Sequence, residues 1–349
     1  MDASTSPAAM PCVSFVVPCY NSSAYMDRCL ESLLIGASDV EVIIVDDGST
    51  RDDTAAKADA WADRYPGIVK VIHQTNKGHG GAVMAGLSAA TGEYLIVVDS
   101  DDWLDRGALE TLLDKLRTLV TSEQPVDLVV TNYVYEHAAL NRSKVVRFRG
   151  AMPQNRVFRW ADVGFFGPGQ NLMIHATVFR TQVLRDCGLQ LPEHTFYVDN
   201  IFVYVPLPYV KTLYYLPVNL YRYYIGREDQ SVNQRVLVRQ LDQQMRVTDF
   251  MVDAVKLPDD VPEPRHAKFM REVLGAIVAA SSGIAVSAGT PEALAMRAAM
   301  WAHLHAVDPA LAKLIRRQPL VFATNLPGRA GQAFTAAGYR FAHWVYPFN

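Results

Sequence analysis

The sequence predicts an α/β protein with a mostly parallel sheet flanked by helices, followed by a helical C-terminal region. In the first hundred residues, apolar β-branched segments alternate with amphipathic segments, which is the pattern of strands joined by crossover helices. The strand segments are apolar throughout, as expected for a parallel sheet that is covered on both faces. Such sheets bind ligands beyond the carboxyl ends of their strands, so the candidate binding residues are expected at those ends.

The predicted elements alternate regularly along this part of the chain. Strands are expected at 13–18, 40–46, 68–73 and 93–99. Helices are expected at 23–34, 54–65, 80–90 and 103–116. From about residue 126 the pattern loosens, and further strands are expected at 127–133 and 212–224. A soft boundary near residue 235 then leads into an alanine-rich helical region.

The composition excludes several classes of protein. The chain has 349 residues, of which half are hydrophobic and 20% are charged, with a net charge of -3. These averages fit a globular protein, and they speak against a fibrous or disordered chain and against nucleic acid as a partner. The four cysteines form no CxxC pair and no zinc-type cluster, so reduced thiols and a cytoplasmic location are expected.

Two segments raise the question of a membrane. The apolar segment 13–17 is too short for a secretory signal, so no export is expected. The uncharged segment 273–291 consists largely of Ala, Ser and Gly, which favours a buried helix over a membrane span.

Acidic residues follow the fourth predicted strand directly. Asp99, Asp101 and Asp102 lie within four residues, and such a cluster is hard to keep ionised unless a cation or solvent compensates the charge. Carboxylates of this kind suit a hard divalent metal that bridges diphosphate oxygens. The alternative is that Asp102 or Asp105 caps the helix that follows. For Asp99 and Asp101 together, metal binding is the preferred interpretation.

Two further loops carry residues suited to a nucleotide. Asp46 and Asp47 end the second strand, where an acid can accept hydrogen bonds from a base or a ribose, although Asp-Gly is also ordinary turn chemistry. The segment 76–81 is rich in glycine and precedes a helix, so its backbone amides can approach a phosphate. This segment is neither a dinucleotide fingerprint nor a Walker motif. His79 within it fits a plain loop histidine as well as a functional one.

The ordered set of these motifs resembles a known family. Segments 17–21, 45–50, 76–78 and 99–101 match, in order and spacing, the nucleotide-binding half of family 2 glycosyltransferases of the bacterial cell-surface polysaccharide type. The resemblance implies a GT-A (Rossmann-like) fold and inverting transfer of a sugar from a nucleotide sugar, most simply a UDP-sugar. It implies Mn²⁺ or Mg²⁺ on the DXD acids Asp99 and Asp101. The implied nucleotide contacts are Pro18, Tyr20, Asn21, Asp46, Asp47, Asn76, Lys77, Gly78, Asp99 and Ser100. Which of Asp46 and Asp47 faces the base stays open.

The resemblance also implies a catalytic base on the acceptor side. Members of the family carry an acid at a helix start about a hundred residues beyond the metal site, and Asp199 occupies that place. Val198 stands where many members have Glu, so a single carboxylate is left for the role. The alternative is that Asp199 is the N-cap of a helix beginning at Asn200.

A basic segment near the end of the resemblance is similar to a loop that closes over the donor in bacterial members. Arg222 and Arg227 are its candidates for the diphosphate leaving group, because guanidinium groups suit phosphates. Both could equally be surface charges paired with Glu228 or Asp229.

The resemblance covers about residues 12–232 and suggests a domain plan. Residues 1–234 are expected to form the GT-A domain, with a nucleotide-binding half (12–102) and an acceptor-side half (103–234). Residues 235–349 are expected to form a helical region of unassigned role. The expected acceptor is a saccharide or a lipid-linked saccharide in polysaccharide or glycolipid synthesis.

Other interpretations are weaker. A sugar-phosphate nucleotidylyltransferase would carry a glycine-rich basic signature near its N-terminus, which this chain lacks. A non-catalytic nucleotide-sensing module would end before the aromatic segments that follow residue 126. The aromatic, mildly basic tail 339–348 allows peripheral contact with the inner face of the cell membrane, although core packing or a dimer contact is the simpler interpretation. The sequence leaves the oligomeric state open.

Overall fold

The computed structural model describes residues 10–35, 39–122, 125–137, 141–167, 169–225 and 234–326, and short pieces between 328 and 338. The chain divides into two compact units. Unit 1 comprises Met1–Glu136, Arg142–His194 and Tyr209–Tyr224, and unit 2 comprises His137–Asn141, Thr195–Pro208 and Ile225–Asn349. The domain boundary expected near residue 235 stays a prediction.

Four parallel strands form the first half of the sheet in unit 1. They are β1 (Val13–Cys19), β2 (Val40–Asp46), β3 (Val69–His73) and β4 (Tyr94–Val97), in the spatial order β3-β2-β1-β4. Every residue of β1, β2 and β4 is buried, which explains why these segments are mainly apolar. All four strands agree with the prediction from the sequence.

Beyond β4 the sheet becomes mixed, because β9 runs antiparallel to both β4 and β6, and β10 runs antiparallel to β5 and β8. It continues in the order β9, β6, β10, β5, with β7 beside β6 and β8 beside β10. Their bounds are β5 Trp103–Leu104, β6 Leu128–His137, β7 Arg142–Val146, β8 Val157–Phe158, β9 Thr177–Arg180 and β10 Leu213–Ile225. The α/β fold class is therefore confirmed.

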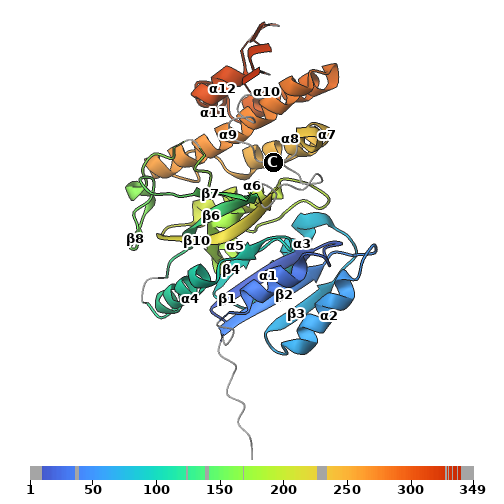
Figure 1. The fold of residues 1–349 in the computed structure, drawn as a ribbon. Helices are drawn as coiled ribbons and strands as arrows, with labels where there is room; N and C mark the ends of the chain where they lie inside the picture. Colours follow the sequence, from blue (N-terminus) through green and yellow to red (C-terminus); the bar gives the residue numbers. More distant parts are fainter. Residues whose placement is uncertain are drawn as a thin grey trace, which may run out of the picture. The chain divides into compact units, whose positions relative to one another are not determined.

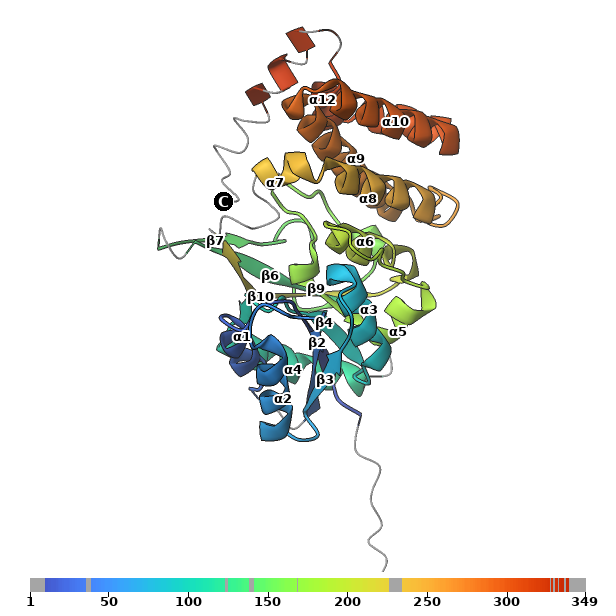
Figure 2. The same cartoon turned by 90° about the vertical axis from the view of Figure 1, so that its right-hand side faces the viewer.

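Helices cover both faces of the parallel strands. Figure 2 shows α1 (Met26–Leu33) and α2 (Thr54–Arg64) on one side of these strands and α3 (Gly78–Ala89) on the other. In α3, Gly86 lies directly against Val16 of β1, so a larger side chain would clash there. Unit 1 also contains α4 (Arg106–Val120), α5 (Thr181–Asp186) and the short 3-10 helices η3 (Trp160–Asp162) and η4 (Ile174–Ala176). A further 3-10 helix, η5 (Leu207–Tyr209), lies where the chain returns from unit 2.

The fourth predicted helix begins later than expected. Trp103 and Leu104 pair with β10 as the short strand β5, so α4 starts at Arg106. The carboxylate of Asp105 accepts a hydrogen bond from the Ala108 amide at 3.1 Å, which makes Asp105 the N-cap. Asp102 is therefore not the cap of α4.

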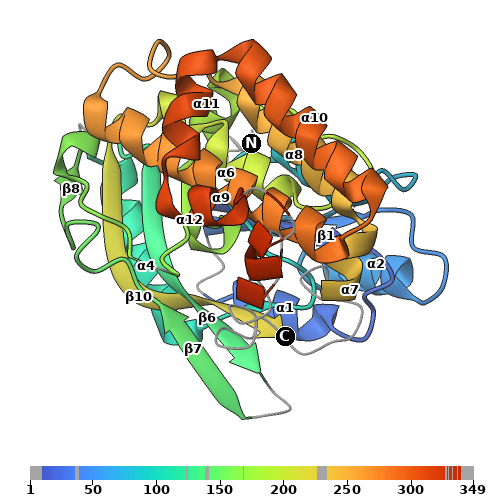
Figure 3. The ribbon, with the colours of Figure 1, turned by 90° about the horizontal axis from the view of Figure 1, so that it is seen from above.

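Unit 2 is helical, as expected for the C-terminal region. It contains α6 (Val198–Tyr204), α7 (Gln234–Arg239), α8 (Leu241–Ala254), α9 (Pro264–Ala288), α10 (Pro291–Val307), α11 (Pro309–Arg316) and α12 (Pro319–Thr324). Helix α9 packs against α7, α8, α10, α11 and α12, and α6 packs against α8 (Figures 1 and 3). A buried polar cluster joins α8 to α9, since Ser281 Oγ lies 3.1 Å from Gln244 Nε2 and 2.9 Å from Thr248 Oγ1.

One helix among the described residues is long and apolar enough to cross a membrane. This helix is α9, with a mean hydropathy of 1.5 over its most apolar window, and 67% of that window is buried inside the protein. The burial fits a core helix, in line with the expectation for the segment 273–291.

The first prediction concerns a buried histidine of unit 2. His266, near the start of α9, is 4% exposed, and burial lowers its pKa from 6.5 to about 4. Between these values the unfolded chain binds a proton more readily than the folded unit. The free energy of unfolding should therefore be at its full value above pH 6.5. It should fall by up to about 3 kcal/mol as the pH drops to 4.

Urea denaturation followed by circular dichroism at several pH values measures this loss. In the variant His266→Leu, the free energy of unfolding should depend less on pH between 6.5 and 4. His305→Leu replaces an exposed histidine on α10 and serves as the control, which should keep the dependence of the wild type. An equal slope in the His266 variant and the wild type would contradict the prediction.

Candidate active site

The loops after β1 and β2 are joined through one asparagine. Asn21 adopts a left-handed backbone conformation with φ 48°, and its side-chain oxygen accepts hydrogen bonds from the amides of Thr50 (3.1 Å) and Arg51 (3.0 Å). Its own amide donates to Ser49 Oγ at 2.9 Å. The buried Nδ2 of Asn21 has no hydrogen-bond partner within the described part of the chain. The structure thus brings the first two predicted motifs together.

Asp47 joins the loop after β2 to the start of α3. Its two carboxylate oxygens accept hydrogen bonds from the amides of Lys77 and Gly78, both at 2.8 Å, and Gln74 Nε2 donates to it at 2.7 Å. The side chain is buried, so these contacts satisfy its charge inside the protein. Asp47 therefore positions the glycine-rich segment that the sequence singles out.

Asp46 is also held by its neighbours. It accepts a hydrogen bond from the Ser49 amide at 3.0 Å, and its other oxygen lies 2.9 Å from Nδ1 of His73 at the end of β3. The carboxylates of Asp46 and, more weakly, Asp59 raise the pKa of His73. Asp46, which ends β2, and Asp47, which follows it, thus both have partners within the protein, and the question of which one meets a base stays open.

Two glycines allow these loops to approach one another. Gly48 has φ 73°, and a Cβ on it would lie 2.9 Å from the Asn76 amide nitrogen. Gly78 has φ 77°, and a Cβ on it would lie 2.9 Å from the His194 amide nitrogen. Side chains at either position would push the loops apart, so glycine is required there for steric as well as conformational reasons.

The remaining predicted nucleotide residues differ in exposure. The Tyr20 side chain is 47% exposed at the end of β1, with the Arg51 guanidinium 5.9 Å from its ring. Pro18 is buried within β1, and Ser100 is buried after β4. Lys77 forms an ion pair with Glu193 at 3.2 Å. Tyr20 is therefore the predicted residue that offers a flat exposed surface.

Asp99 lies between two histidines. One oxygen is 2.8 Å from His79 Nε2, and the other is 3.7 Å from Nε2 of His175, which precedes β9. Burial disfavours the charged carboxylate, but the two histidines outweigh this effect and hold the pKa of Asp99 below its ordinary value. Asp99 is therefore ionised at neutral pH. His79 and His175 were not among the predicted site residues.

Asp102 has the opposite electrostatic character. It is buried, accepts a hydrogen bond from the Tyr221 hydroxyl at 2.8 Å, and accepts another from the Tyr224 amide at 2.7 Å. Burial, followed by the charges of Asp101 and Asp99, raises the pKa of Asp102 well above its ordinary value. Two neighbouring carboxyl groups whose pKa values are pushed apart are typical of functional sites.

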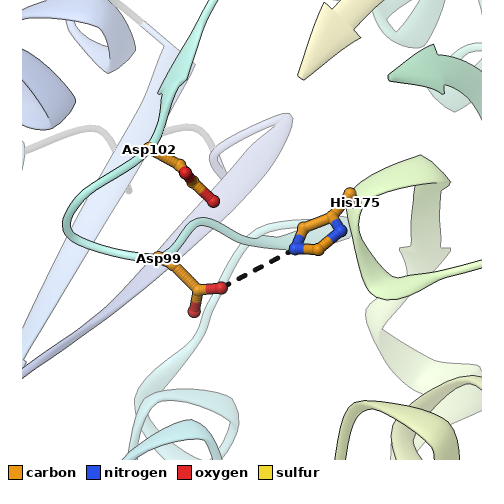
Figure 4. A group of neighbouring side chains, drawn as sticks. All are labelled: Asp99, Asp102 and His175. Carbon is orange, nitrogen blue, oxygen red and sulfur yellow. Dashed lines mark ion pairs between the residues drawn. The ribbon is translucent and has the colours of Figure 1, made fainter. Parts of the chain in front are cut away.

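Asp99, Asp102 and His175 form a candidate metal centre. Each offers one ligand atom, and these atoms lie within 4.8 Å of one another. Figure 4 shows the three side chains pointing toward a common point, with Asp99 and Asp102 on one loop and His175 on another segment. The ring of His175 is held by Tyr221 and Tyr223, whose centroids lie 4.5 and 4.6 Å away. Two carboxylates and an imidazole are a donor set that a divalent metal accepts. The predicted partner of Asp99, Asp101, is half-buried on the same loop.

Of the two arginines predicted to contact the diphosphate, only Arg222 belongs to the described part of the chain. Arg222, on β10, forms ion pairs with Glu136 at 2.7 Å and with Asp105 at 2.8 Å. Glu228 and Asp229, the partners considered from the sequence, lie outside the described residues. Arg227 lies outside the described residues. The phosphate role of both stays a prediction.

Asp199 belongs to unit 2. Helix α6 begins at Val198, two residues earlier than expected, and its N-cap position is Tyr197 with φ 65°. Asp199 thus lies in the first turn, and the interpretation as an N-cap is wrong. The side chain of Asn200 donates a hydrogen bond to Asp199 at 3.3 Å and another to the Tyr197 carbonyl at 3.0 Å. The carboxylate is held at a helix start, where negative charge is favoured.

Comparisons with known proteins identify the class of the domain. Residues 14–179, which contain β1 to β4 and the loops at their carboxyl ends, match the model for glycosyl transferase family 2. This segment is therefore a family 2 glycosyltransferase domain.

A curated relative agrees with this assignment. The chain is 40% identical over 125 residues to glycosyltransferase GlyG of Streptococcus pneumoniae, and the match covers 35% of this chain and 38% of GlyG. The chain thus spans little more than a third of the length of the curated relatives that it matches first.

Solved structures share the fold. S. aureus TarS 1–349 in complex with UDP-GlcNAc superposes with a TM-score of 0.64 at 17% identity, covering 96% of this chain and 92% of that one. The mannosyltransferase PcManGT of Pyrobaculum calidifontis, in complex with GDP-Man and Mn²⁺, superposes with a TM-score of 0.51 at 17% identity, covering 96% and 87%. At these identities the likeness establishes the fold.

Proposed function

We propose that this protein transfers a sugar from a UDP-sugar to an acceptor hydroxyl with inversion at the anomeric carbon. The observation that carries the proposal is the gathering of four polar loops at the carboxyl ends of β1 to β4, with the ionised Asp99 among them. This edge of a parallel sheet is where such folds bind ligands. The UDP-GlcNAc bound to TarS supports a uridine donor.

The donor is assigned to the loops of unit 1. The exposed ring of Tyr20 provides a surface on which a base can stack, and the Nδ2 of Asn21 supplies a hydrogen-bond donor. Asn76, Lys77 and Gly78 belong to the same proposed site, but the amides of Lys77 and Gly78 already donate to Asp47 and are not offered to the diphosphate. Asp46 and Asp47 keep this arrangement in place, whichever of them also contacts the uridine. Ser100 belongs to the same proposed site.

The diphosphate end of the donor is assigned to the loop after β4. Asp99 and Asp101 are proposed to hold Mn²⁺ or Mg²⁺, and the arrangement of Asp102 and His175 adds two further candidate ligands. A bound divalent metal would neutralise charge on the leaving diphosphate. Arg222 and Arg227 are proposed to act on the same leaving group.

Asp199 is proposed as the general base. An inverting displacement requires one group that takes the proton from the attacking hydroxyl, and no covalent intermediate with the protein. A carboxylate in the first turn of α6 can perform this step when the acceptor hydroxyl comes within hydrogen-bond distance of it.

The acceptor and the location follow from the resemblance to bacterial members of the family. We propose a saccharide or lipid-linked saccharide acceptor in cell-surface polysaccharide or glycolipid synthesis, used by a cytoplasmic protein at the inner face of the membrane. The GT-A domain is proposed to end near residue 234, ahead of the helical region 235–349.

Release of UDP from a panel of UDP-sugars, with and without added saccharide acceptors, tests the proposal. We expect metal-dependent release that EDTA abolishes and that a suitable acceptor stimulates. Binding of UDP without transfer or hydrolysis of any donor would support a nucleotide-sensing module. It would contradict the proposed transferase activity.

The second prediction concerns the choice of metal. Imidazole favours transition metals, whereas Mg²⁺ prefers oxygen ligands. If His175 is a ligand, the protein should bind Mn²⁺ more tightly than Mg²⁺, and His175→Gln should weaken Mn²⁺ binding by about tenfold or more while changing Mg²⁺ binding less.

Electron paramagnetic resonance of free Mn²⁺, with competition by Mg²⁺, measures both affinities. His303→Gln, which alters a histidine paired with Asp253 in unit 2, is the control and should leave both unchanged. Equal loss of Mn²⁺ and Mg²⁺ binding in the His175 variant would show that this side chain only supports the loop.

A further inference from the structure

Charge is distributed unevenly along the chain. The whole protein has a net charge of -3, yet residues 309–349 contain no Asp or Glu. The basic residues of this segment are Lys313, Arg316, Arg317, Arg329 and Arg340. The C-terminal segment is therefore a basic region on an otherwise acidic protein, and it is attracted to anionic surfaces.

The described part of this segment also exposes large apolar side chains. Leu314 on α11 is 45% exposed, and Leu320 and Phe322 on α12 are 60% and 61% exposed. Their neighbours Ile315 and Val321 are completely buried. Both helices thus have an inner side packed within unit 2, and they expose further apolar side chains that the unit does not cover.

Hydrogen bonds at both ends of α12 hold the helix that carries Leu320 and Phe322 in place. Gln318, between α11 and α12, donates a hydrogen bond from Nε2 to the Arg271 carbonyl of α9 at 3.0 Å. At the end of α12, Asn325 accepts a hydrogen bond from Arg297 of α10 at 2.7 Å and donates to the Val321 carbonyl at 2.8 Å. The exposure of Leu320 and Phe322 therefore belongs to a fixed part of the fold.

Two exposed cations belong to the same segment of the chain. Lys313 and Arg317 are exposed at the end of α11, and within the part of the chain that the structure describes neither forms an ion pair with a carboxylate. Arg316 differs, because its guanidinium lies 5.8 Å from the Trp301 ring. We call Lys313, Leu314, Arg317, Leu320 and Phe322 the C-terminal surface.

We propose that the C-terminal surface docks on an anionic lipid bilayer. Large apolar side chains beside Lys and Arg are the combination that enters the boundary between headgroups and acyl chains, where each basic residue adds attraction to anionic lipid. A nucleic acid would use the positive charge but would leave the apolar side chains exposed, so lipid accounts for both features. This inference does not depend on the proposed enzymatic activity.

Vesicle flotation of the full-length protein tests the proposal. One set of vesicles contains phosphatidylcholine alone, and the other contains phosphatidylcholine with phosphatidylglycerol. We expect binding to the anionic vesicles that weakens as salt is added, and little binding to the neutral ones. The variants Leu320→Ser with Phe322→Ser, and Lys313→Glu with Arg317→Glu, should each weaken binding by about tenfold or more.

Matched changes in unit 1 provide the controls. Phe165→Ser replaces a side chain that is 71% exposed, and Arg106→Glu reverses an exposed charge, and both should bind vesicles as the wild type does. Unchanged circular dichroism and melting temperature show that the variants are folded. Three outcomes would overturn the proposal: no binding to anionic vesicles, equal binding to both vesicle types, or wild-type binding by both C-terminal variants.

Discussion

Replacing Asp199 with Asn is expected to lower kcat for sugar transfer by about 10²–10⁴-fold. The amide keeps the size of the side chain at the start of α6 but cannot take a proton from the acceptor hydroxyl. Because Asp199 is the single carboxylate assigned to this step, no neighbouring acid in the first turn replaces it. UDP binding should stay within about twofold of the wild type, since the donor loops belong to unit 1.

A second helix offers a matched control. Asp242 lies in the first turn of α8, is exposed, and pairs with Arg246 at 3.5 Å. Asp242→Asn repeats the same chemical change at a helix start and should retain wild-type kcat. Steady-state kinetics with one donor and acceptor pair measures both variants. Wild-type turnover by Asp199→Asn would contradict the role of Asp199 as general base. It would not contradict the proposed donor site.

Replacing Asp99 with Asn is expected to lower kcat/KM for the donor by about 10²–10³-fold. The carboxylate of Asp99 is ionised between His79 and His175. Asp99 belongs both to the metal-binding pair predicted from the sequence and to the candidate metal centre of the structure. The amide should weaken both Mn²⁺ binding and the effect of Mn²⁺ on UDP affinity. Asp63→Asn, at an exposed position on α2, is the control and should behave as the wild type.

Excess metal separates two explanations of this loss. If Asp99 serves through the metal, raising Mn²⁺ should recover part of the activity of Asp99→Asn. Loss of folding, seen as a lower melting temperature, would instead assign Asp99 a structural role beside the histidines. Full activity of the variant at low Mn²⁺ would contradict the proposed metal centre.

The sequence predicts the parallel half of the fold well because local pattern determines it. The strands β1 to β4 are mainly apolar segments, and each is followed by polar or glycine-rich residues typical of turns. The carboxyl ends of parallel strands meet at one edge, so the loops after β1, β2 and β3 could be expected to lie together. The hydrogen bonds of Asn21 and Asp47 between these loops agree with that expectation.

The residues that the sequence did not reveal lie far apart along the chain. His175 reaches Asp99 only because β9 pairs with β4, and Tyr221 reaches Asp102 because β10 lies beside β5. No local motif marks His175, since it precedes a short strand without other acids or histidines nearby. The pKa values of Asp99 and Asp102 shift in opposite directions because of burial and of partners that are distant in sequence. The spacing of the three acids does not predict these effects.

Isothermal titration calorimetry of UDP against the full-length protein, with Mn²⁺ and with EDTA, tests the central claim most directly. The account predicts that UDP binds one site per chain in Mn²⁺, that EDTA weakens this binding strongly, and that Asp99→Asn shows the weak binding in either buffer. Absence of UDP binding in Mn²⁺, or UDP binding of equal strength in EDTA and in the Asp99 variant, would contradict a metal-assisted nucleotide site at the carboxyl ends of β1 to β4.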